Sequence, residues 1–261
     1  MLLIEPIRAF RDNYIWLLQD SHSNRSCVVD PGDATPVIEA LSSRNLTLEA
    51  ILITHHHPDH VGGVAQLVER YAARVYGPES DHFTAVDVVL TDGDRRQVLD
   101  HDFEVLTVPG HTLDHIAYYH RTPGQAPALF PGDTLFAGGC GRLFEGTAEQ
   151  MHHSLSKLAA LPEATRIFCA HEYTLANLRF ALAVEPGNVA LQQRLDEVER
   201  LREKDLPTLP STIATEKATN PFLRTAEPEV AAAAARYRGH DSLPAPAADT
   251  FAAIRSWKDN A

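Results

Sequence analysis

The sequence has few of the features that mark secreted or membrane proteins. It contains only three cysteines, Cys27, Cys140 and Cys169, and an odd number without close spacing does not form a disulfide framework. No apolar run approaches the ~20 residues of a membrane-spanning helix, and the first residues lack a basic segment followed by a long apolar one. We therefore expect reduced thiols, no signal peptide, no membrane association and a cytoplasmic protein.

The sequence is also short of positive charge. Its 23 lysines and arginines face 35 aspartates and glutamates, which gives a formal net charge of -12. A chain this acidic repels phosphate backbones, so we expect no nucleic-acid partner. The 261 residues, 44% of them hydrophobic, are enough for one large domain or two smaller ones with a sizeable core.

The pattern of apolar residues predicts two parts of different character. Short apolar runs between turn residues indicate strands, and apolar residues three or four apart indicate helices. Up to His171 both kinds occur, with strands predicted over 14–18, 27–29, 51–53, 104–108, 115–120, 128–131 and 166–170, and helices over 35–44, 61–71 and 149–160. Strand-like runs nearly vanish beyond it, where helices are predicted over 175–184, 190–204 and 229–238. We predict an α/β domain at 1–171 and a small all-helical domain at 172–261.

Four of the apolar strands end in a side chain that can bind a metal ion. These side chains are His55, His111, Asp133 and His171. In sheets flanked by helices, function gathers where strands end and loops converge, and we extend that rule to this chain by analogy. The four strand ends therefore predict one shared site.

The run His55-His56-His57-Pro58-Asp59-His60 supplies most of the predicted ligands. His55 and His57 are two residues apart and face the same side of an extended segment, so both can bind one cation. Asp59 and His60 follow a turn forced by Pro58. His56 points away from its neighbours and is not counted as a ligand.

Seven candidate ligands are too many for one tetrahedral metal and fit two metals ~3.5–4 Å apart. The set comprises His55, His57, Asp59, His60, His111, Asp133 and His171. Asp133 would bridge the metals, and Asp59 would bind the second metal and orient a hydroxide that attacks an electrophilic carbonyl or phosphoryl centre. Imidazole and carboxylate ligands suit zinc, iron and manganese alike. The remaining histidines are expected to be structural or at the surface: His22, His82, His101, His120, His152, His153 and His240.

These motifs resemble a known family. Thr54 to His60 is similar to the signature of the metallo-β-lactamase superfamily, and Gly110-His111-Thr112, Gly132-Asp133-Thr134 and Ala170-His171-Glu172-Tyr173 resemble its other metal motifs. Within it the chain resembles the glyoxalase II (hydroxyacylglutathione hydrolase) family. The resemblance implies an αββα sandwich followed by a helical substrate-binding domain. It also implies hydrolysis of S-D-lactoylglutathione to D-lactate and glutathione, the second step of methylglyoxal detoxification, with two divalent metal ions, zinc being the first choice.

The resemblance also implies roles for individual residues. His55, His57 and His111 would bind the first metal, and Asp59, His60 and His171 the second, with Asp133 shared. The glutathione thioester would contact Arg142, Phe144, Tyr173, Arg255 and Lys258. The family often has lysine and tyrosine where this chain has Arg142 and Phe144, so the charge is kept and a hydroxyl is lost. Cations at Arg255 and Lys258 suit the two carboxylates of glutathione.

Three rival functions share parts of this pattern. A glutathione persulfide dioxygenase with a single iron would share the 55–60 run but lack the helical tail with Arg255 and Lys258. A metal-dependent nuclease would need a basic arm, and a non-catalytic metal-binding module would not need the carboxylate of Asp133. We therefore favour the thioester hydrolase, expected as a monomer.

Overall fold

The computed structural model describes residues 1–121, 124–239 and 246–261, so the prediction for His240 lies outside the described residues. The chain forms two compact units. Unit 1 comprises residues 1–107, 114–132 and 168–171, and unit 2 comprises residues 108–113, 133–167 and 172–261. The predicted domain boundary at residue 171 stays a prediction.

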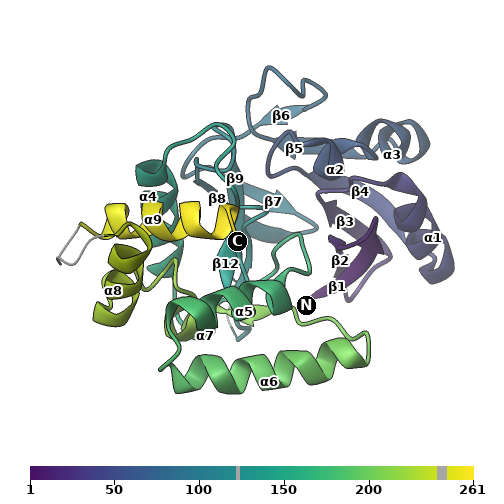
Figure 1. Cartoon of the computed structure of the whole chain (residues 1–261). Helices are drawn as coiled ribbons and strands as arrows, with labels where there is room; N and C mark the ends of the chain where they lie inside the picture. Colours follow the sequence, from purple (N-terminus) through teal and green to yellow (C-terminus); the bar gives the residue numbers. More distant parts are fainter. Residues whose placement is uncertain (122–123, 240–245) are drawn as a thin grey trace. The chain divides into compact units, whose positions relative to one another are not determined.

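The first sheet of unit 1 runs in the order of the chain from β1 to β6 (Figure 1). Its first three strands pair antiparallel, and the pairs from β3 to β6 are parallel. The strands are Leu2–Ala9, Asn13–Asp20, Arg25–Val29, Thr47–Leu52, Arg74–Gly77 and Val88–Val89. The parallel strands β3 and β4 therefore end at the same edge, and the residues that follow them lie close together.

Two helices cover one face of this sheet, α1 (Ala34–Arg44) and α3 (Val64–Tyr71) (Figure 1). Leu41 of α1 and Leu67 of α3 are buried in one core cluster with Ile51 of β4. Asp33 is the N-cap of α1, where its side chain accepts a hydrogen bond from the backbone of Thr35. The predicted helix over 35–44 is confirmed.

The predicted helix over 61–71 is wrong at its start. The segment holds a short helix α2 (Pro58–Val61), then Gly62 and Gly63, then α3. A Cβ on Gly63 would lie 2.6 Å from both the backbone nitrogen of Ala34 and the carbonyl oxygen of Pro31. Close packing against the 31–34 loop therefore sets the break, which apolar periodicity alone does not reveal.

The second sheet in unit 1 contains β7 (Arg95–Val98), β8 (His101–Thr107), β9 (Ile116–His120) and β10 (Ala128–Phe130). They pair antiparallel in the order β10-β9-β8-β7. Tyr118 of β9 donates a hydrogen bond from its hydroxyl to the carbonyl of Ile53, at 2.9 Å, which ties the second sheet to the end of the first. The charged strand β7 was not predicted, because its polar sequence lacks the apolar run used to find strands.

Unit 2 contains two short strand pairs and most of the helices (Figure 1). One pair is the hairpin of β11 (Leu135–Phe136) and β12 (Gly139–Cys140), and the other joins β13 (Arg166–Ile167) to β14 (Ser211–Thr212). The helices are α4 (Ala148–Ala159), α5 (Thr174–Val184), α6 (Val189–Glu203), α7 (Ile213–Thr219), α8 (Pro228–Tyr237) and α9 (Ala247–Asp259). The four helices predicted here lie within a residue or so of α4, α5, α6 and α8, whereas the strand predicted over 166–170 is only two residues long.

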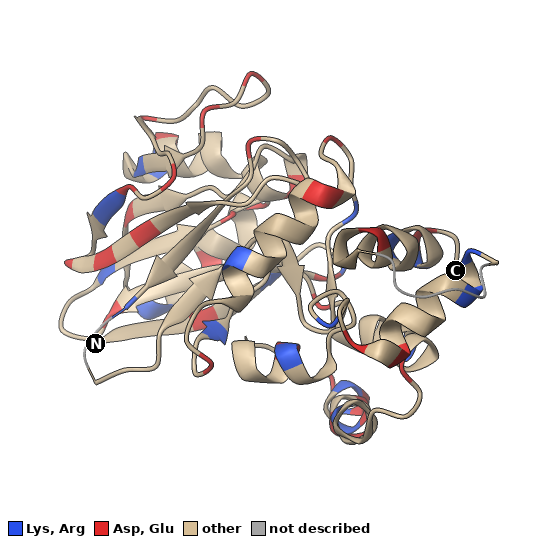
Figure 2. Cartoon of the chain, turned by 90° about the vertical axis from the view of Figure 1, so that its left-hand side faces the viewer, with Lys and Arg blue, Asp and Glu red and all other residues tan. Residues whose placement is uncertain are grey.

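Acidic and basic residues are interspersed along the same strands and helices of the two units (Figure 2). All three cysteines are free and buried. Burial raises the pKa of the Cys27 and Cys140 thiols. Among the described residues, no helix combines the length and the hydrophobicity that crossing a bilayer requires.

The break at Gly63 gives a test of this packing. We expect Gly63→Ala to lower the free energy of unfolding by about 1–3 kcal/mol, because the added methyl group meets backbone atoms that cannot rotate away. Gly77→Ala is the matched control, since its Cβ would lie 3.1 Å from the nearest atom, the Cβ of Ile53. Urea unfolding measures both variants, and equal midpoints would contradict the assignment.

Candidate metal centre

The first group of predicted ligands in unit 1 is His55 and His57. His55 follows β4 and is fully buried. Its Nε2 lies 3.1 Å from Nδ1 of His57. Two nitrogens that bind one tetrahedral metal at ~2.0–2.1 Å lie about 3.3 Å apart. The two rings therefore already have the spacing of ligands that share a cation.

A chain of hydrogen bonds fixes which nitrogen of His55 carries the proton. The hydroxyl of Thr54 donates its proton to Oδ2 of Asp30 at 2.7 Å. The Thr54 oxygen can therefore only accept from Nδ1 of His55, which lies 3.0 Å away. Nδ1 of His55 is therefore protonated, and the lone pair is on Nε2, which faces His57. The same carboxylate of Asp30 accepts from the backbone nitrogen of Thr54 at 2.8 Å.

The second group in unit 1 is Asp59, His60 and His171. Nε2 of His60 and Nε2 of His171 each lie 3.5 Å from Oδ2 of Asp59. Nδ1 of His60 is 3.0 Å from Asp30, and Nδ1 of His171 is 3.0 Å from Asp12. Metal-binding histidines usually hydrogen-bond a carboxylate through one ring nitrogen and direct the other nitrogen at the metal position. His60 and His171 have this arrangement.

Sequence reasoning missed the residues that support this group. Asp30 follows strand β3 just as His55 follows β4, so the strand-end rule would have found it. Asp12 and Asn13 lie just before an apolar run and belong to no metal-binding motif, so the sequence does not single them out. Asp12 orients His171, and Asn13 donates from Nδ2 to Oδ2 of Asp59 at 3.0 Å.

Unit 2 holds the other two predicted ligands, His111 and Asp133. His111 donates from Nδ1 to the carbonyl of Arg142 at 2.8 Å, since a carbonyl can only accept. This leaves the lone pair on Nε2, which lies 3.4 Å from Oδ2 of Asp133. Both side chains are more than nine-tenths buried. His111 and Asp133 are therefore paired within unit 2, with a defined tautomer.

The β11–β12 hairpin lies between Asp133 and Arg142 and is anchored at its tip. Buried Glu216 accepts from the backbone nitrogen of Gly138 at 2.7 Å, and Asn220 donates to the carbonyl of Gly139 at 2.9 Å. Arg194 and Ser211 also bind the carboxylate of Glu216, which balances its charge. The segment 220–224 is therefore structural, and Phe222 is almost fully buried.

Three of the predicted substrate contacts offer exposed surface. Arg142 is 64% exposed, and its Nε lies 3.6 Å from Asp259. Phe144 is 64% exposed, with its ring edge-on to His111 at 5.3 Å. Tyr173 precedes α5 and packs edge-on against Phe136.

The other two, Arg255 and Lys258, lie on α9. Arg255 is buried, donating to the carbonyl of Cys140 at 2.9 Å and to Asp259 at 2.9 Å, so it fastens α9 to the hairpin. Lys258 donates to Oδ1 of Asn177. Burial, followed by the neighbouring Arg255 guanidinium, lowers the pKa of Lys258 to about 8.

Histidines outside the ligand set have other partners. His56 pairs with Asp114 through Nδ1 at 2.9 Å, and its ring lies edge-on to that of His55 with centroids 6.4 Å apart. His115, which sequence reasoning passed over, is fully buried and stacks on the ring of His55 with centroids 4.5 Å apart. It supports the ligand from the side rather than joining the cluster of ring nitrogens.

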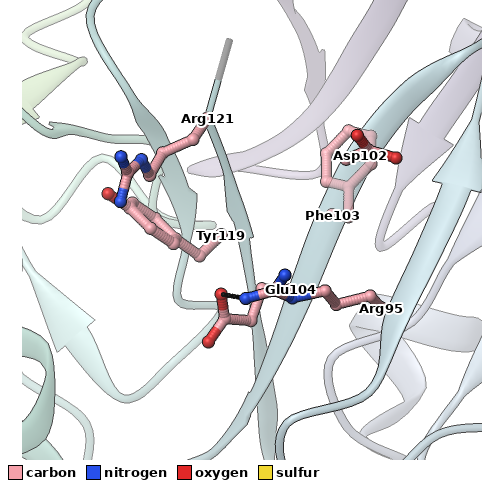
Figure 3. Close-up of a pocket in the computed structure, with 6 residues that line it drawn as sticks. All are labelled: Arg95, Asp102, Phe103, Glu104, Tyr119 and Arg121. Atoms are coloured by element: carbon pink, nitrogen blue, oxygen red, sulfur yellow. Dashed lines mark hydrogen bonds and ion pairs between the residues drawn. The ribbon is translucent and has the colours of Figure 1, made fainter.

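A pocket of about 480 Å³ lies on the face of the second sheet of unit 1 and contains none of the predicted ligands (Figure 3). Its lining is Arg95, Asp102, Phe103, Glu104, Tyr119 and Arg121. Arg95 pairs with Glu104 at 3.5 Å, and the two arginines are matched by two acids. This balance gives no reason to assign the pocket an ionic ligand.

The donor set fits a divalent metal centre. In unit 1 the rings of His55, His60 and His171 each have a hydrogen-bond partner at Nδ1. The lone pair on Nε2 of each ring is therefore directed at a neighbouring ligand. Imidazole and carboxylate groups together suit divalent zinc, iron or manganese. The predicted divalent metal centre is supported on this ground, without a choice of metal.

Two protein-family models match the chain. The metallo-β-lactamase superfamily model matches residues 8–171, and the model described as the hydroxyacylglutathione hydrolase C-terminus matches residues 172–261. A hydroxyacylglutathione hydrolase of Pseudomonas aeruginosa strain LESB58 is 57% identical over 260 residues, which is 99% of each chain. The chain belongs to the hydroxyacylglutathione hydrolase family. It is a thioester hydrolase with the metallo-β-lactamase fold, so the predicted family, fold class and enzyme class are confirmed.

Solved structures agree with this fold. ETHE1 from Myxococcus xanthus is 25% identical, with a TM-score of 0.65, over 99% of this chain and 98% of its own. TTHA1623 in a di-iron-bound form is 26% identical, with a TM-score of 0.58, over 85% of this chain and all of its own. A protein of similar fold is thus known in a di-iron-bound form.

The roles of Asp30 and Asp12 give a test of the centre. Asp30→Asn places an amide donor where a carboxylate accepted, so we expect the tautomers of His55 and His60 to reverse and both metals to bind about 10–100-fold more weakly. Asp12→Asn is expected to weaken only the metal at His171.

Calorimetric titration of zinc into chelator-treated protein measures the two sites. Asp100→Asn, whose carboxylate is exposed and pairs with Arg25, is the control and should bind as the wild type does. Equal loss at both sites in Asp12→Asn would contradict the separate assignments.

Proposed function

We propose that the chain binds two divalent metal ions and uses them to hydrolyse S-D-lactoylglutathione and related S-2-hydroxyacylglutathione thioesters to the hydroxy acid and glutathione. The observation that carries the proposal is the paired geometry of the ligands. His55 and His57 converge in unit 1, with His111 and Asp133 paired in unit 2, while Asp59, His60 and His171 form the second group. In this assignment Asp133 would be a ligand of both metals.

The protein residues have defined tasks in this reaction. The metals, when bound, supply the Lewis acidity that lowers the pKa of a water to ~7. Asp59, whose Oδ2 accepts a hydrogen bond from Asn13, would orient the attacking water toward the thioester carbonyl. Asp30 and Asp12 keep the ligand imidazoles in the correct tautomer throughout.

Binding of glutathione would rest on unit 2. Glutathione carries two carboxylates, and an acidic protein needs local cations to receive them. Arg142 and Lys258 offer these cations, and Tyr173 an exposed aromatic ring. Arg255 acts by holding α9, because its guanidinium already binds Cys140 and Asp259. Phe144 contributes an apolar surface beside His111.

We further propose zinc as the resident metal, a monomeric state, a cytoplasmic location and no nucleic-acid partner. The rival dioxygenase reading is not favoured, because the family matched over the full length is that of hydroxyacylglutathione hydrolases. A single iron with oxygen uptake on glutathione persulfide would be its signature.

The proposal is tested by measuring metals per chain together with thiol release from S-D-lactoylglutathione. We expect two metals and rapid release in the wild type. His57→Ala removes one nitrogen of the His55–His57 pair, so one metal should be lost and kcat should fall by about a hundredfold or more. His153→Ala, on α4, is the control and should keep both metals and full rate. Retained metal and rate in His57→Ala would remove it from the ligand set.

The pKa of Lys258 predicts a pH dependence of substrate binding. Below a pKa of about 8 the side chain is a cation that attracts the glutathione carboxylates, and above it the attraction is lost. We expect KM to rise severalfold between about pH 7 and about pH 9, where the substrate carboxylates stay ionised.

Two variants separate Lys258 from other groups. In Lys258→Arg the charge persists and the rise in KM should disappear, while in Lys258→Met KM should be high and flat with pH. An unchanged rise in Lys258→Met would assign the pH dependence elsewhere.

A further inference from the structure

Phe10 combines two features that folding does not favour. It lies in the turn between β1 and β2 with a φ of 51°, a left-handed conformation that costs a bulky residue roughly 1–2 kcal/mol. Its side chain is 60% exposed. Neither the backbone nor the burial of apolar surface therefore accounts for a phenylalanine here, and residues held in such conformations tend to cluster at functional sites.

The ring lies next to the second group of metal ligands. A Cβ on Gly32 would lie 2.9 Å from Cε2 of Phe10 and 1.9 Å from the carbonyl oxygen of Asp59, so the ring and the backbone of Asp59 both pack against the same side of Gly32. The same turn carries Asp12 and leads into Asn13, which contact His171 and Asp59. All of these residues belong to unit 1.

The chemistry of this position indicates what the ring contacts. An uncharged aromatic ring does not recognise a carboxylate, so the ring of Phe10 does not suit the charged ends of glutathione. An apolar surface beside the reacting carbonyl suits the carbon side chain of the acyl group better than any other part of the thioester.

We propose that Phe10 is a specificity-determining residue whose exposed ring contacts the acyl side chain of the thioester. This rests on the proposed function. The ring favours acyl groups with larger apolar side chains, because they bury more surface against it. The ring of Phe10 does not take part in metal binding. Asp12 and Asn13 of the same loop support the metal ligands instead.

The experiment compares kcat/KM for acetyl-, D-lactoyl- and mandeloylglutathione in the wild type, Phe10→Ala, Phe10→Gly and Phe10→Tyr. We expect both truncations to lower kcat/KM for the mandeloyl thioester about tenfold more than for the acetyl thioester. Phe10→Tyr, which keeps the ring, should retain the wild-type order of substrates. Val89→Ala, at another exposed apolar position of unit 1, should leave all three values unchanged.

The glycine variant separates contact from backbone geometry. Glycine accepts the left-handed conformation without cost, so wild-type kinetics on every thioester in Phe10→Gly would show that the residue only shapes the turn, and would overturn the proposal. A fall in metal content in both truncations would overturn it as well, since the ring would then act on the ligands. A wild type that cleaves none of the thioesters would instead refute the proposed function, and this inference with it.

Discussion

The candidate centre depends on one buried carboxylate. Asp30 accepts hydrogen bonds from Thr54 and from His60, and through the Thr54 hydroxyl it also sets the proton of His55. It thereby orients one ligand assigned to each metal. A buried carboxylate is costly unless several donors surround it, and here two side chains and a backbone nitrogen do so. The requirement to satisfy Asp30 holds β3 and the loop after β4 in one arrangement.

Unit 2 holds its ligands in a different way. His111 and Asp133 lie on loops. The carbonyl of Arg142, which follows the hairpin, accepts a hydrogen bond from His111, and Nε2 of His111 lies 3.4 Å from Asp133. The hairpin is in turn held by Glu216 and Asn220, which lie on and just after a helix far along the chain. Helical residues beyond residue 171 therefore do more than form a surface for substrate. They position the segment that carries two predicted metal ligands.

Much of this arrangement was predictable from the sequence, and the failures have common causes. Apolar periodicity located α1, α4, α5, α6 and α8, because each buries one face. It missed β7, whose residues are polar, and it joined α2 to α3, because the break at Gly63 comes from packing against a distant loop. Ligand types and spacing predicted seven metal ligands. The structure brings five of them together in unit 1 as two adjoining groups: His55, His57, Asp59, His60 and His171.

The residues around the ligands were harder to find. Asp12 and Asn13 are ordinary turn residues by sequence, and only tertiary contact turns them toward His171 and Asp59. The reverse holds for Arg255, which sequence reasoning assigned to substrate and which the structure shows bound to Cys140 and Asp259. Local sequence gives the chemistry of a side chain, while its partners are chosen by segments far away in the chain.

The burial of all three cysteines has a consequence for an enzyme whose product is itself a thiol. Exchange between a protein thiol and glutathione disulfide begins with a thiolate that the small molecule can reach. Cys27, Cys140 and Cys169 are all inaccessible, and for the first two the proton is held more tightly than in a free thiol. Catalysis can therefore proceed amid high concentrations of glutathione, reduced or oxidised, without the enzyme becoming covalently attached to what it releases.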